Sequence, residues 1–427
     1  MKRPLKRPGW HPGVALGIGA VAAGLLVAAI PAMRAPTAPA IPAPTDQTSV
    51  CIPGQSESTA YVLGDSALSS GLLGDQPETG AAQLVATKQT RPLVITSAKR
   101  FAAGVLTTDA GTASWSRCVA PRTTGLVQLV SAQASELVLV NTDDTAAVVD
   151  FSLYGQSGEI PALGSRGLTL PPRSSRPLPV AVLVPEDQPV GVEMRVTSGR
   201  IAVVGRSWVS SAADFSPAAT PATSVLLPGV FATPKQTRVL VTNPGDQVAT
   251  VNVAALTTQR IALQGAQAVE VPARATTAID VTGSLGGEAA TLAVTSDQPV
   301  AATAIVSTDR DYAVSGASDA FTVGRLLAPS GGVLSVSNPS DAPVTVTLSV
   351  TVDGGTPAKQ EIAIPAGRTW TTAAPTTGTV EYNVLATSPV VAAVSGSQPG
   401  SAWIAPLQSL TQTSVADVTM AYRPRLR

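Results

Sequence analysis

Histidine is almost absent from this sequence, and its absence excludes most nucleophilic and metal-assisted chemistry. Among 427 residues the single histidine is His11, near the N-terminus. Ser-His-Asp and Cys-His catalytic sets, and zinc sites built on histidine, all need an imidazole. Lysine-assisted serine chemistry needs a serine three residues before a lysine, and the lysines beyond residue 34 lack one: Lys88, Lys99, Lys235 and Lys359. The sequence predicts a protein that is not an enzyme and has no cofactor and no catalytic metal.

Aromatic residues are also few, at 4%, although 44% of the residues are hydrophobic. A core must therefore be built mainly from Val, Ala, Leu and Ile. Frequent Val and Thr favour strands. The 36 glycines and 36 prolines imply many turns and leave little room for long helices. This composition predicts an all-β fold.

Positive charge is concentrated at the N-terminus. The chain has 28 basic and 28 acidic residues, and five of the basic ones lie in or beside the N-terminal segment, which leaves 23 basic against 28 acidic residues elsewhere. Binding to a nucleic-acid backbone requires a basic face. The mildly acidic body therefore predicts no nucleic-acid partner.

An uncharged apolar run follows the basic N-terminus. It extends from Val14 to Ile30 and continues through residue 33, about the 20 residues needed to cross a hydrocarbon core. The positive-inside rule predicts a cytoplasmic segment at 1–13, a transmembrane signal anchor at 14–33 and export of everything after it. The alternative is a cleaved signal peptide and a secreted protein, with a small-x-small site at residues 38–40. Residues 34–48 are rich in Pro and Ala and predict an extended spacer.

Only two cysteines are present, Cys51 and Cys118, and both lie on the predicted exported side. In an oxidising compartment two such thiols are expected to form one disulfide. Closing a loop of this length stabilises by about 4 kcal/mol on the chain-entropy model.

Internal repeats fill the predicted extracytoplasmic body at 49–427. Three stretches pair two alternating strands around an asparagine, and their pattern predicts β-hairpins; the asparagines are Asn141, Asn243 and Asn338. Asparagine suits such a turn because it tolerates left-handed φ and bonds to its own backbone. A second pattern carries a Thr-Ser pair followed by a strand of Ala, Val and Gly, which predicts a crowded strand buried on both sides.

Combining both patterns gives eight related segments. Their turn positions are residues 51, 97, 141, 198, 243, 296, 338 and 388. The spacing averages about 48 residues, close to one four-stranded propeller blade. We therefore expect a β-propeller of seven or eight blades after the transmembrane helix. The alternative is four full repeats that form tandem immunoglobulin-like β-sandwiches.

The chain also resembles an actinobacterial family of exported proteins of unknown function. The likeness rests on the apolar N-terminal span, the Val-Cys-x-Pro-Gly string around Cys51, the Trp115 that precedes Cys118, and the repeated L-x-V-x-N-P segments. The first repeat departs from it, with Asn-Thr in place of Asn-Pro. The resemblance implies a single membrane span and work at the cell envelope, and it brings no known activity or binding residues.

Two acidic clusters and one group of aromatic residues are candidate site residues. Asp143-Asp144 and Asp309-Arg310-Asp311 are expected to be solvated loops, and their spacing does not support a calcium loop. Four aromatic residues each follow a Thr-Ser segment: Trp115, Trp208, Tyr312 and Trp403. On one rim they would form a stacking or protein-binding platform. The alternative is that each closes a local core.

The tether, the spacer, the repeats and the missing catalytic residues predict a non-enzymatic cell-envelope scaffold or binding protein. It would be displayed outside the cytoplasmic membrane, with another envelope protein or a cell-wall glycan as its partner. One alternative is an accessory subunit of a membrane glycosyltransferase or of other cell-wall machinery. The other is a carboxylate-based glycan-active enzyme, which needs two acids from different repeats within about 5–10 Å of each other in a cleft.

Overall fold

The computed structural model describes residues 47–209, 212–398 and 401–410. The predicted cytoplasmic segment 1–13, the predicted transmembrane helix 14–33 and most of the spacer 34–48 lie outside the described residues. Gln47 and Thr48 of the predicted spacer already belong to the first strand. Within the described part of the chain, no helix has the length and apolar character that a membrane span needs. Antiparallel strands make up nearly all the regular structure there, so the predicted all-β fold is confirmed.

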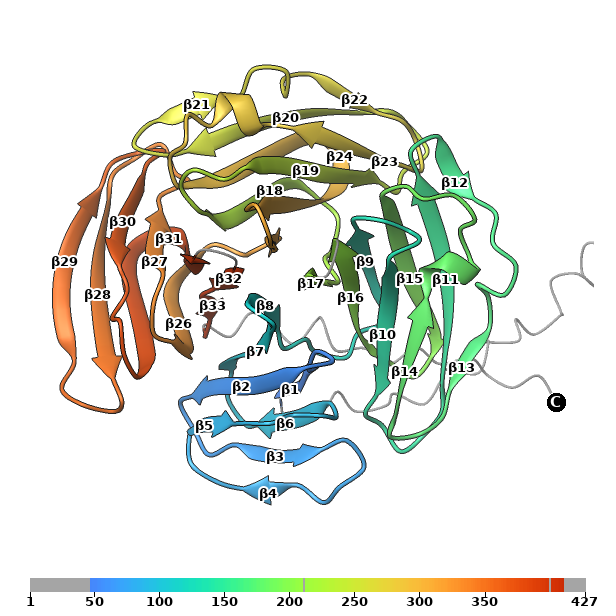
Figure 1. Cartoon of the computed structure of the whole chain (residues 1–427), viewed down its shortest axis with the longest axis horizontal. Helices are drawn as coiled ribbons and strands as arrows, with labels where there is room; N and C mark the ends of the chain where they lie inside the picture. The colour runs from blue at the N-terminus through green and yellow to red at the C-terminus, as the bar shows by residue number, and fades with distance from the viewer. Residues whose placement is uncertain (1–46, 210–211, 399–400, 411–427) are drawn as a thin grey trace, which may run out of the picture. The chain divides into compact units, whose positions relative to one another are not determined.

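The described residues form four modules, each of two antiparallel layers (Figure 1). Module 1 covers residues 47–117. Its first layer contains β1(Gln47–Cys51), β6(Leu93–Ser97), β3(Ser69–Leu72) and β4(Glu78–Thr79). Its second layer contains β5(Gln83–Ala86), β2(Glu57–Gly64), β7(Phe101–Asp109) and β8(Thr112–Arg117).

Module 2 covers residues 124–217. Its first layer contains β9(Thr124–Leu129), β15(Val190–Ser198), β11(Ala147–Gly155), β12(Gly158–Ile160) and β13(Leu168–Leu170). Its second layer contains β14(Ser174–Pro179), β10(Ser135–Asn141), β16(Ala202–Val209) and β17(Ala212–Pro217). A short 3-10 turn, η1(Val180–Val182), follows β14.

Module 3 covers residues 222–316, and one long strand, β24(Ala290–Ser307), runs through both of its layers. The first layer adds β18(Ala222–Val230), β20(Ala249–Leu256), β21(Arg260–Ala262) and β22(Val269–Val271). The second layer adds β19(Gln236–Asn243), β23(Ala275–Asp280) and β25(Tyr312–Gly316), with the 3-10 turn η2(Thr282–Ser284) after β23.

Module 4 covers residues 321–409 and repeats this plan with β31(Thr379–Gln398) as the shared strand. The first layer adds β26(Phe321–Pro329), β28(Val344–Val352), β29(Ala358–Ile364) and β33(Gln408–Ser409). The second layer adds β27(Val333–Ser337), β30(Thr369–Ala373) and β32(Ser401–Pro406).

A hydrophobic core lies between the two layers of each module, and the cores of modules 3 and 4 extend into residues of a neighbouring module. In module 2, Val149 and Phe151 of the first layer pack in one cluster with Leu139 and Val203 of the second. Alternating strands place every second side chain on such a shared inner face. The paired layers correspond to the alternative prediction of four sandwiches, and they do not show the preferred propeller of seven or eight blades.

The predicted asparagine hairpins are wrong in their pairing, although the strands on both sides are present. The strand before each asparagine lies in one layer and the strand after it lies in the other, as β19 and β20 show around Asn243. Both strands turn their apolar side chains toward one core, and alternation along a strand does not reveal its hydrogen-bonding partner. The chain therefore crosses between layers where the sequence predicted a hairpin.

Each crossing is held by the buried asparagine side chain. Asn243 Nδ2 donates to the backbone oxygens of Gln247, Val271 and Pro272 at 2.6, 3.1 and 3.2 Å, and its Oδ1 accepts from Gly245 N at 3.0 Å. Equivalent sets of four bonds surround the other two asparagines, Asn141 and Asn338. None of the three has a positive φ. The reason for asparagine is therefore its hydrogen bonding and not left-handed backbone.

The strands rich in Ala, Val and Gly are crowded and buried as predicted. They form four true hairpins, β7–β8, β16–β17, β24–β25 and β31–β32, one in each module. The second strand of each hairpin meets those of its neighbours, because β8 and β25 both contact β17 and β32. These four inner strands thus connect the four modules in a closed circle of contacts.

Candidate binding cleft between the first two modules

Two buried aspartates join the inner strands of different modules. Asp311 directly precedes β25, and its Oδ2 accepts from Ala113 N of β8 at 3.0 Å and Ala402 N of β32 at 2.7 Å. Its Oδ1 accepts from Tyr312 N at 2.9 Å. Asp311 is 4% exposed, so the prediction that its cluster is a solvated loop is wrong for this residue. The side chain joins modules 1, 3 and 4.

Asp214 of β17 makes the matching connection between modules 2 and 3. Its two carboxylate oxygens accept from Phe215 N at 2.7 Å and Val314 N at 2.5 Å. The Tyr312 hydroxyl donates to Ser207 O at 2.6 Å. Burial raises the pKa of Asp214 well above its ordinary value, and burial likewise raises the pKa of Asp311. Low polarity penalises the ionised form of each carboxyl.

These two acids come from different modules, but they do not form a glycosidase pair in a cleft. Both are buried, and their oxygens are occupied by backbone N–H donors. A glycosidase carboxyl must instead face a substrate or a water molecule. Asp214 and Asp311 therefore support a structural role, in which they hold the inner strands together.

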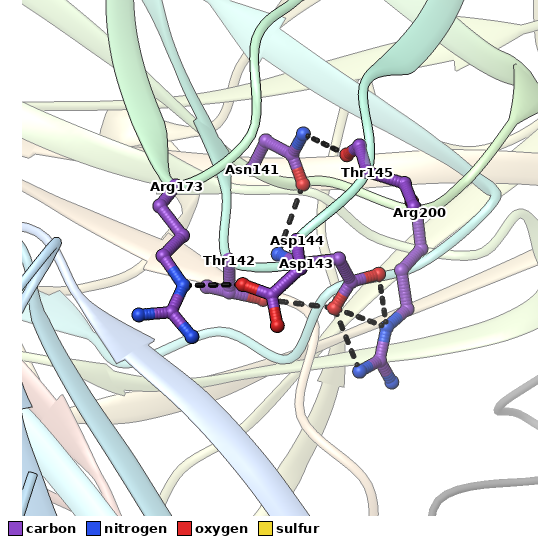
Figure 2. A network of polar contacts seen from close by, with 7 residues as sticks. All are labelled: Asn141, Thr142, Asp143, Asp144, Thr145, Arg173 and Arg200. Atoms are coloured by element: carbon purple, nitrogen blue, oxygen red, sulfur yellow. Dashed lines mark hydrogen bonds and ion pairs between the residues drawn. The ribbon is translucent and has the colours of Figure 1, made fainter.

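The other acidic cluster divides between a buried pair and a surface pair (Figure 2). Arg200 donates to both oxygens of Asp143, from Nη2 at 3.0 Å and from Nε at 3.1 Å, and both side chains are largely buried. Arg173 pairs with the exposed Asp144. Within the described residues no group of three or more His, Cys, Asp or Glu side chains is placed to hold a metal.

Three of the four candidate aromatic residues are core residues. Trp115, Tyr312 and Trp403 are 3%, 1% and 6% exposed. The Trp115 ring lies between Tyr61 and Trp403, with centroid distances of 6.0 and 6.3 Å. A stacking platform needs exposed ring faces, so these positions match the alternative in which each ring closes a core.

Trp208, at the end of β16, is the member of the group that reaches a cavity. It is half-buried, and the Arg206 guanidinium lies over its ring at 5.2 Å from the centroid. The cleft beside it separates module 1 from module 2 and comprises two adjoining cavities of about 320 and 50 Å³. Both are lined by the Gly54–Ser56 segment and Arg206. The larger is further lined by Ile52, Pro53, Gln89, Thr90, Pro92, Val138, Ser175 and Pro177. The smaller is further lined by Thr107, Asp109, Thr112, Ser114, Trp208, Ala213 and Phe215.

Arg206 is the central charged residue of this cleft. It is 7% exposed, and its Nη2 donates to Glu136 of the neighbouring strand β10. A buried guanidinium paired with a carboxylate adds little net charge to its surroundings. The cleft is therefore polar but nearly neutral at this point.

Two buried polar atoms in the cleft lining have no hydrogen-bond partner. One is the donor Arg206 Nε, and the other is the acceptor Gln89 Oε1. Buried polar atoms are normally satisfied, and an unsatisfied one costs about 1–3 kcal/mol. Each of the two atoms has less than 1 Å² of accessible surface, so both are enclosed by the fold and neither faces the cavity.

The predicted disulfide is confirmed between Cys51 and Cys118, whose Cα atoms are 4.2 Å apart. It joins the end of β1 to the residue after β8. The chain passes directly from Cys51 into the residues that line the larger cavity. The disulfide therefore anchors one wall of the cleft.

Sequence reasoning identified Trp208 but missed Arg206 and Gln89. Neither residue belongs to a motif, and they are 117 positions apart in the sequence. A signal did exist in the strand pattern, because arginine interrupts the apolar run of β16 where the other crowded strands carry small or apolar residues. Arginine in a buried strand needs a partner, and that partner could not be named before the layers were known.

Comparison with known proteins gives a family but no activity. The model of a family of unknown function, DUF5719, matches residues 73–375, and no curated protein matches. One solved structure, described as the crystal structure of a tetra-tandem repeat in the extending region of a large adhesion protein, is 11% identical. That match covers 84% of this chain and 93% of the other, with a TM-score of 0.10. The family match covers most of the chain, and the protein belongs to the DUF5719 family of unknown function.

Proposed function

We propose that this chain is a non-enzymatic binding protein of the cell envelope, tethered by residues 14–33, with its four modules outside the membrane. The observation that carries the proposal is the cleft between modules 1 and 2, a cavity of about 320 Å³ whose lining includes the polar residues Gln55, Ser56 and Thr90. The lining residues include one acid, Asp109, whereas general acid–base hydrolysis of a glycoside needs two. The cleft is suited to binding and not to bond cleavage.

The disulfide supports an extracytoplasmic location. Cys51 and Cys118 are both buried, and such bonds persist in oxidising compartments. A bond that fixes β1 beside β8 belongs to the folded state of module 1. Its formation in the cell would require export of this part of the chain before or during folding.

The other three module interfaces are closed by polar contacts, which gives the cleft a rigid frame. Between modules 2 and 3, Gln128 Nε2 donates to Leu240 O at 2.9 Å and Ala301 O at 3.2 Å. Between modules 3 and 4, Thr369 Oγ1 donates to Leu256 O at 2.6 Å. Between modules 4 and 1, Gln408 makes two bonds to the backbone of β7.

The interface between modules 1 and 2 differs, because it packs through an apolar cluster and leaves the cleft beside it. Val50 and Ile52 from module 1 contact Val138 and Val140 from module 2 in this cluster. A rigid frame with one open interface is a pre-organised binding site, which lowers the ordering cost of binding.

Location and binding are tested separately. Alkaline phosphatase fused after residue 40 should be active, and fused after residue 10 inactive; the reverse result would refute the export.

A photoreactive residue at Gln55, in the cleft, should give a discrete adduct with envelope material in intact cells. The same residue at the exposed Gln360 of β29 serves as the control. Equal labelling from both positions would contradict a binding role for the cleft. Capture of a membrane glycosyltransferase from Gln55 alone would assign the protein as its accessory subunit.

A further inference from the structure

We propose that two copies of this chain pair side by side along the edge strand β29 of module 4. The pairing is antiparallel and two-fold symmetric about Gln360, so that the first layer of module 4 continues from one copy into the other. This interaction surface is separate from the cleft and goes beyond the proposed function. Three observations support it: an open strand edge, its self-complementary charges and the prolines at its two ends.

The edge of β29 is open along its whole length. Its seven residues, Ala358–Ile364, pair with β28 in one unbroken register on one side, and no other described strand pairs with them. Figure 1 shows β29 as the outermost strand of module 4. An edge strand presents a row of unpaired N–H and C=O groups, which makes it a template for a further strand.

The corresponding edges of the other modules are short or interrupted. In module 2 the edge is divided between β12 and β13, and in module 3 between β21 and β22, each of three residues. In module 1 the strand at this edge, β4, has two residues. Very short edge strands are a common protection against unwanted pairing. Modules 1–3 therefore have this protection, and module 4 lacks it.

The charges on β29 complement a second copy of the same strand. Lys359 and Glu361 are exposed, and within the described residues neither side chain has a hydrogen bond or an ion pair. In an antiparallel pair centred on Gln360, Lys359 of each copy lies directly opposite Glu361 of the other. The two-fold symmetry makes this contact twice, and opposite charges that face each other across two strands stabilise the pair.

The same charges disfavour the neighbouring registers. A pair centred on Lys359 would place two ammonium groups opposite each other, and one centred on Glu361 would do the same with two carboxylates. Like charges directly opposite each other are destabilising. A lysine on an edge strand also opposes pairing with an unrelated strand that offers it no acid. A second copy supplies an acid to Lys359 and a base to Glu361 at the same time.

Two prolines limit the pairing to this segment. Pro357 precedes β29 and Pro365 follows it. Proline has no N–H for a ladder, so the paired strands end at these positions. The two-fold arrangement uses the edge of each copy once and closes as a dimer, with no β29 edge left for a third copy. The contact is a single strand pair, so we expect a weak and reversible dimer.

Cysteine crosslinking of the full-length chain in isolated cell membranes tests the pairing. Gln360→Cys places two thiols opposite each other on the symmetry axis, where the paired Cα atoms are about 4.5–5.5 Å apart, within the reach of a disulfide. Mild oxidation should give a disulfide-linked dimer. The control Ala363→Cys is also exposed but lies three residues from the axis. Its two Cα atoms would be about 20 Å apart, so this variant should remain monomeric.

Exchange of the charges tests the register, with the dimer measured by analytical ultracentrifugation of the purified chain in detergent. Lys359→Glu and Glu361→Lys each replace two opposite-charge contacts by two like-charge contacts. Each should weaken the dimer at least about tenfold. The double variant restores the complementarity and should restore the dimer. A mixture of the two single variants should form a heterodimer in preference to either homodimer.

Several outcomes would overturn the pairing. They are the absence of a dimer from Gln360→Cys, an equal yield from Ala363→Cys, a disulfide from Gln360→Cys to a different protein, and a double charge variant as weak as the single ones. None of these results bears on the cleft or on export. In the photocrosslinking experiment, the control position Gln360 should capture a second copy of this chain and no other envelope material, and the mass of the adduct distinguishes the two.

Discussion

The buried asparagine of module 3 permits a sharp test of what holds the layers together. Asn243→Asp keeps the size of the side chain and keeps the bond that Oδ1 accepts from Gly245 N. It replaces the Nδ2 donor by an oxygen that faces three backbone oxygens, those of Gln247, Val271 and Pro272. Each lost bond contributes about 1 kcal/mol. We therefore expect the free energy of unfolding of module 3 to fall by about 3 kcal/mol.

The same substitution should make stability depend on pH. An unpaired carboxylate at a position that is 0% exposed is expected to have a raised pKa, because burial disfavours the ionised form. A protonated carboxyl would restore one donor toward the carbonyls. A folded-state pKa above the unfolded value means that stability is greatest at low pH and falls as the pH rises through that window. The destabilisation should therefore be smaller at pH 4.5 than at pH 8.

Urea denaturation followed by circular dichroism measures both effects. Asn252→Asp is the matched control, because its half-buried side chain accepts one bond from Ala268 N, which Asp retains. We expect its effect to be below about 0.5 kcal/mol, as for an ordinary surface substitution. Equal stability of the Asn243→Asp and Asn252→Asp variants would refute a structural role for the Nδ2 donor. A loss that is independent of pH would refute the buried-charge part of the reasoning.

Further predictions concern the inner strands and the disulfide. Asp311→Ala leaves three buried N–H groups without an acceptor, and urea denaturation should show a loss of at least about 3 kcal/mol in the free energy of unfolding. The control Asp309→Ala, in an exposed ion pair, should change it by less than about 1 kcal/mol. Equal effects of the two variants would contradict the role of Asp311 in joining the inner strands. Burial raises the pKa of Asp214 well above its ordinary value, so its contribution to stability should fall as the pH rises above about 4. In thermal melts from pH 4 to 7, Asp214→Asn should reduce the dependence of the melting temperature on pH. An unchanged dependence would show that other groups cause it. Cys51→Ser removes the disulfide, which closes a loop with a sequence separation of 67, and should destabilise module 1 by about 4 kcal/mol. A free thiol titrated in the unreduced wild-type protein would instead show that the two cysteines are not paired.

Several features could be read from the amino-acid sequence because they depend on local chemistry. Alternating Val and Thr give strands, and the run of Ala, Val and Gly after each Thr-Ser pair gives a strand that is buried on both faces. The two cysteines allow one pairing, which the structure confirms. The three repeated asparagines marked places where one strand ends and the chain passes to the next. Each of these inferences needs only the neighbouring residues or a count.

The pairing of strands was not accessible in the same way. A strand on either side of Asn243 shows the same alternation whether it joins its neighbour in a hairpin or crosses to the opposite layer. The long strands β24 and β31 likewise carry a Thr-Ser segment within one continuous strand, where the pattern suggested a turn. Hydrogen-bond partners depend on what lies beside a strand in space, so the choice between propeller and sandwiches required the structure.

The reversal for Asp311 has the same cause. In the sequence it stands beside Asp309 and Arg310 in what reads as a polar loop, and its neighbour Asp309 is indeed exposed. The burial of Asp311 comes from β8 and β32, which approach from modules far away in the chain. The cleft arises similarly, because Gln89 and Arg206 line one cavity only where module 1 packs on module 2. Local residue chemistry set the strands, the disulfide and the absence of histidine chemistry in this body. The packing of distant modules decided which polar groups are buried and which of them find a partner, because burial and hydrogen-bond partners are properties of the assembled fold.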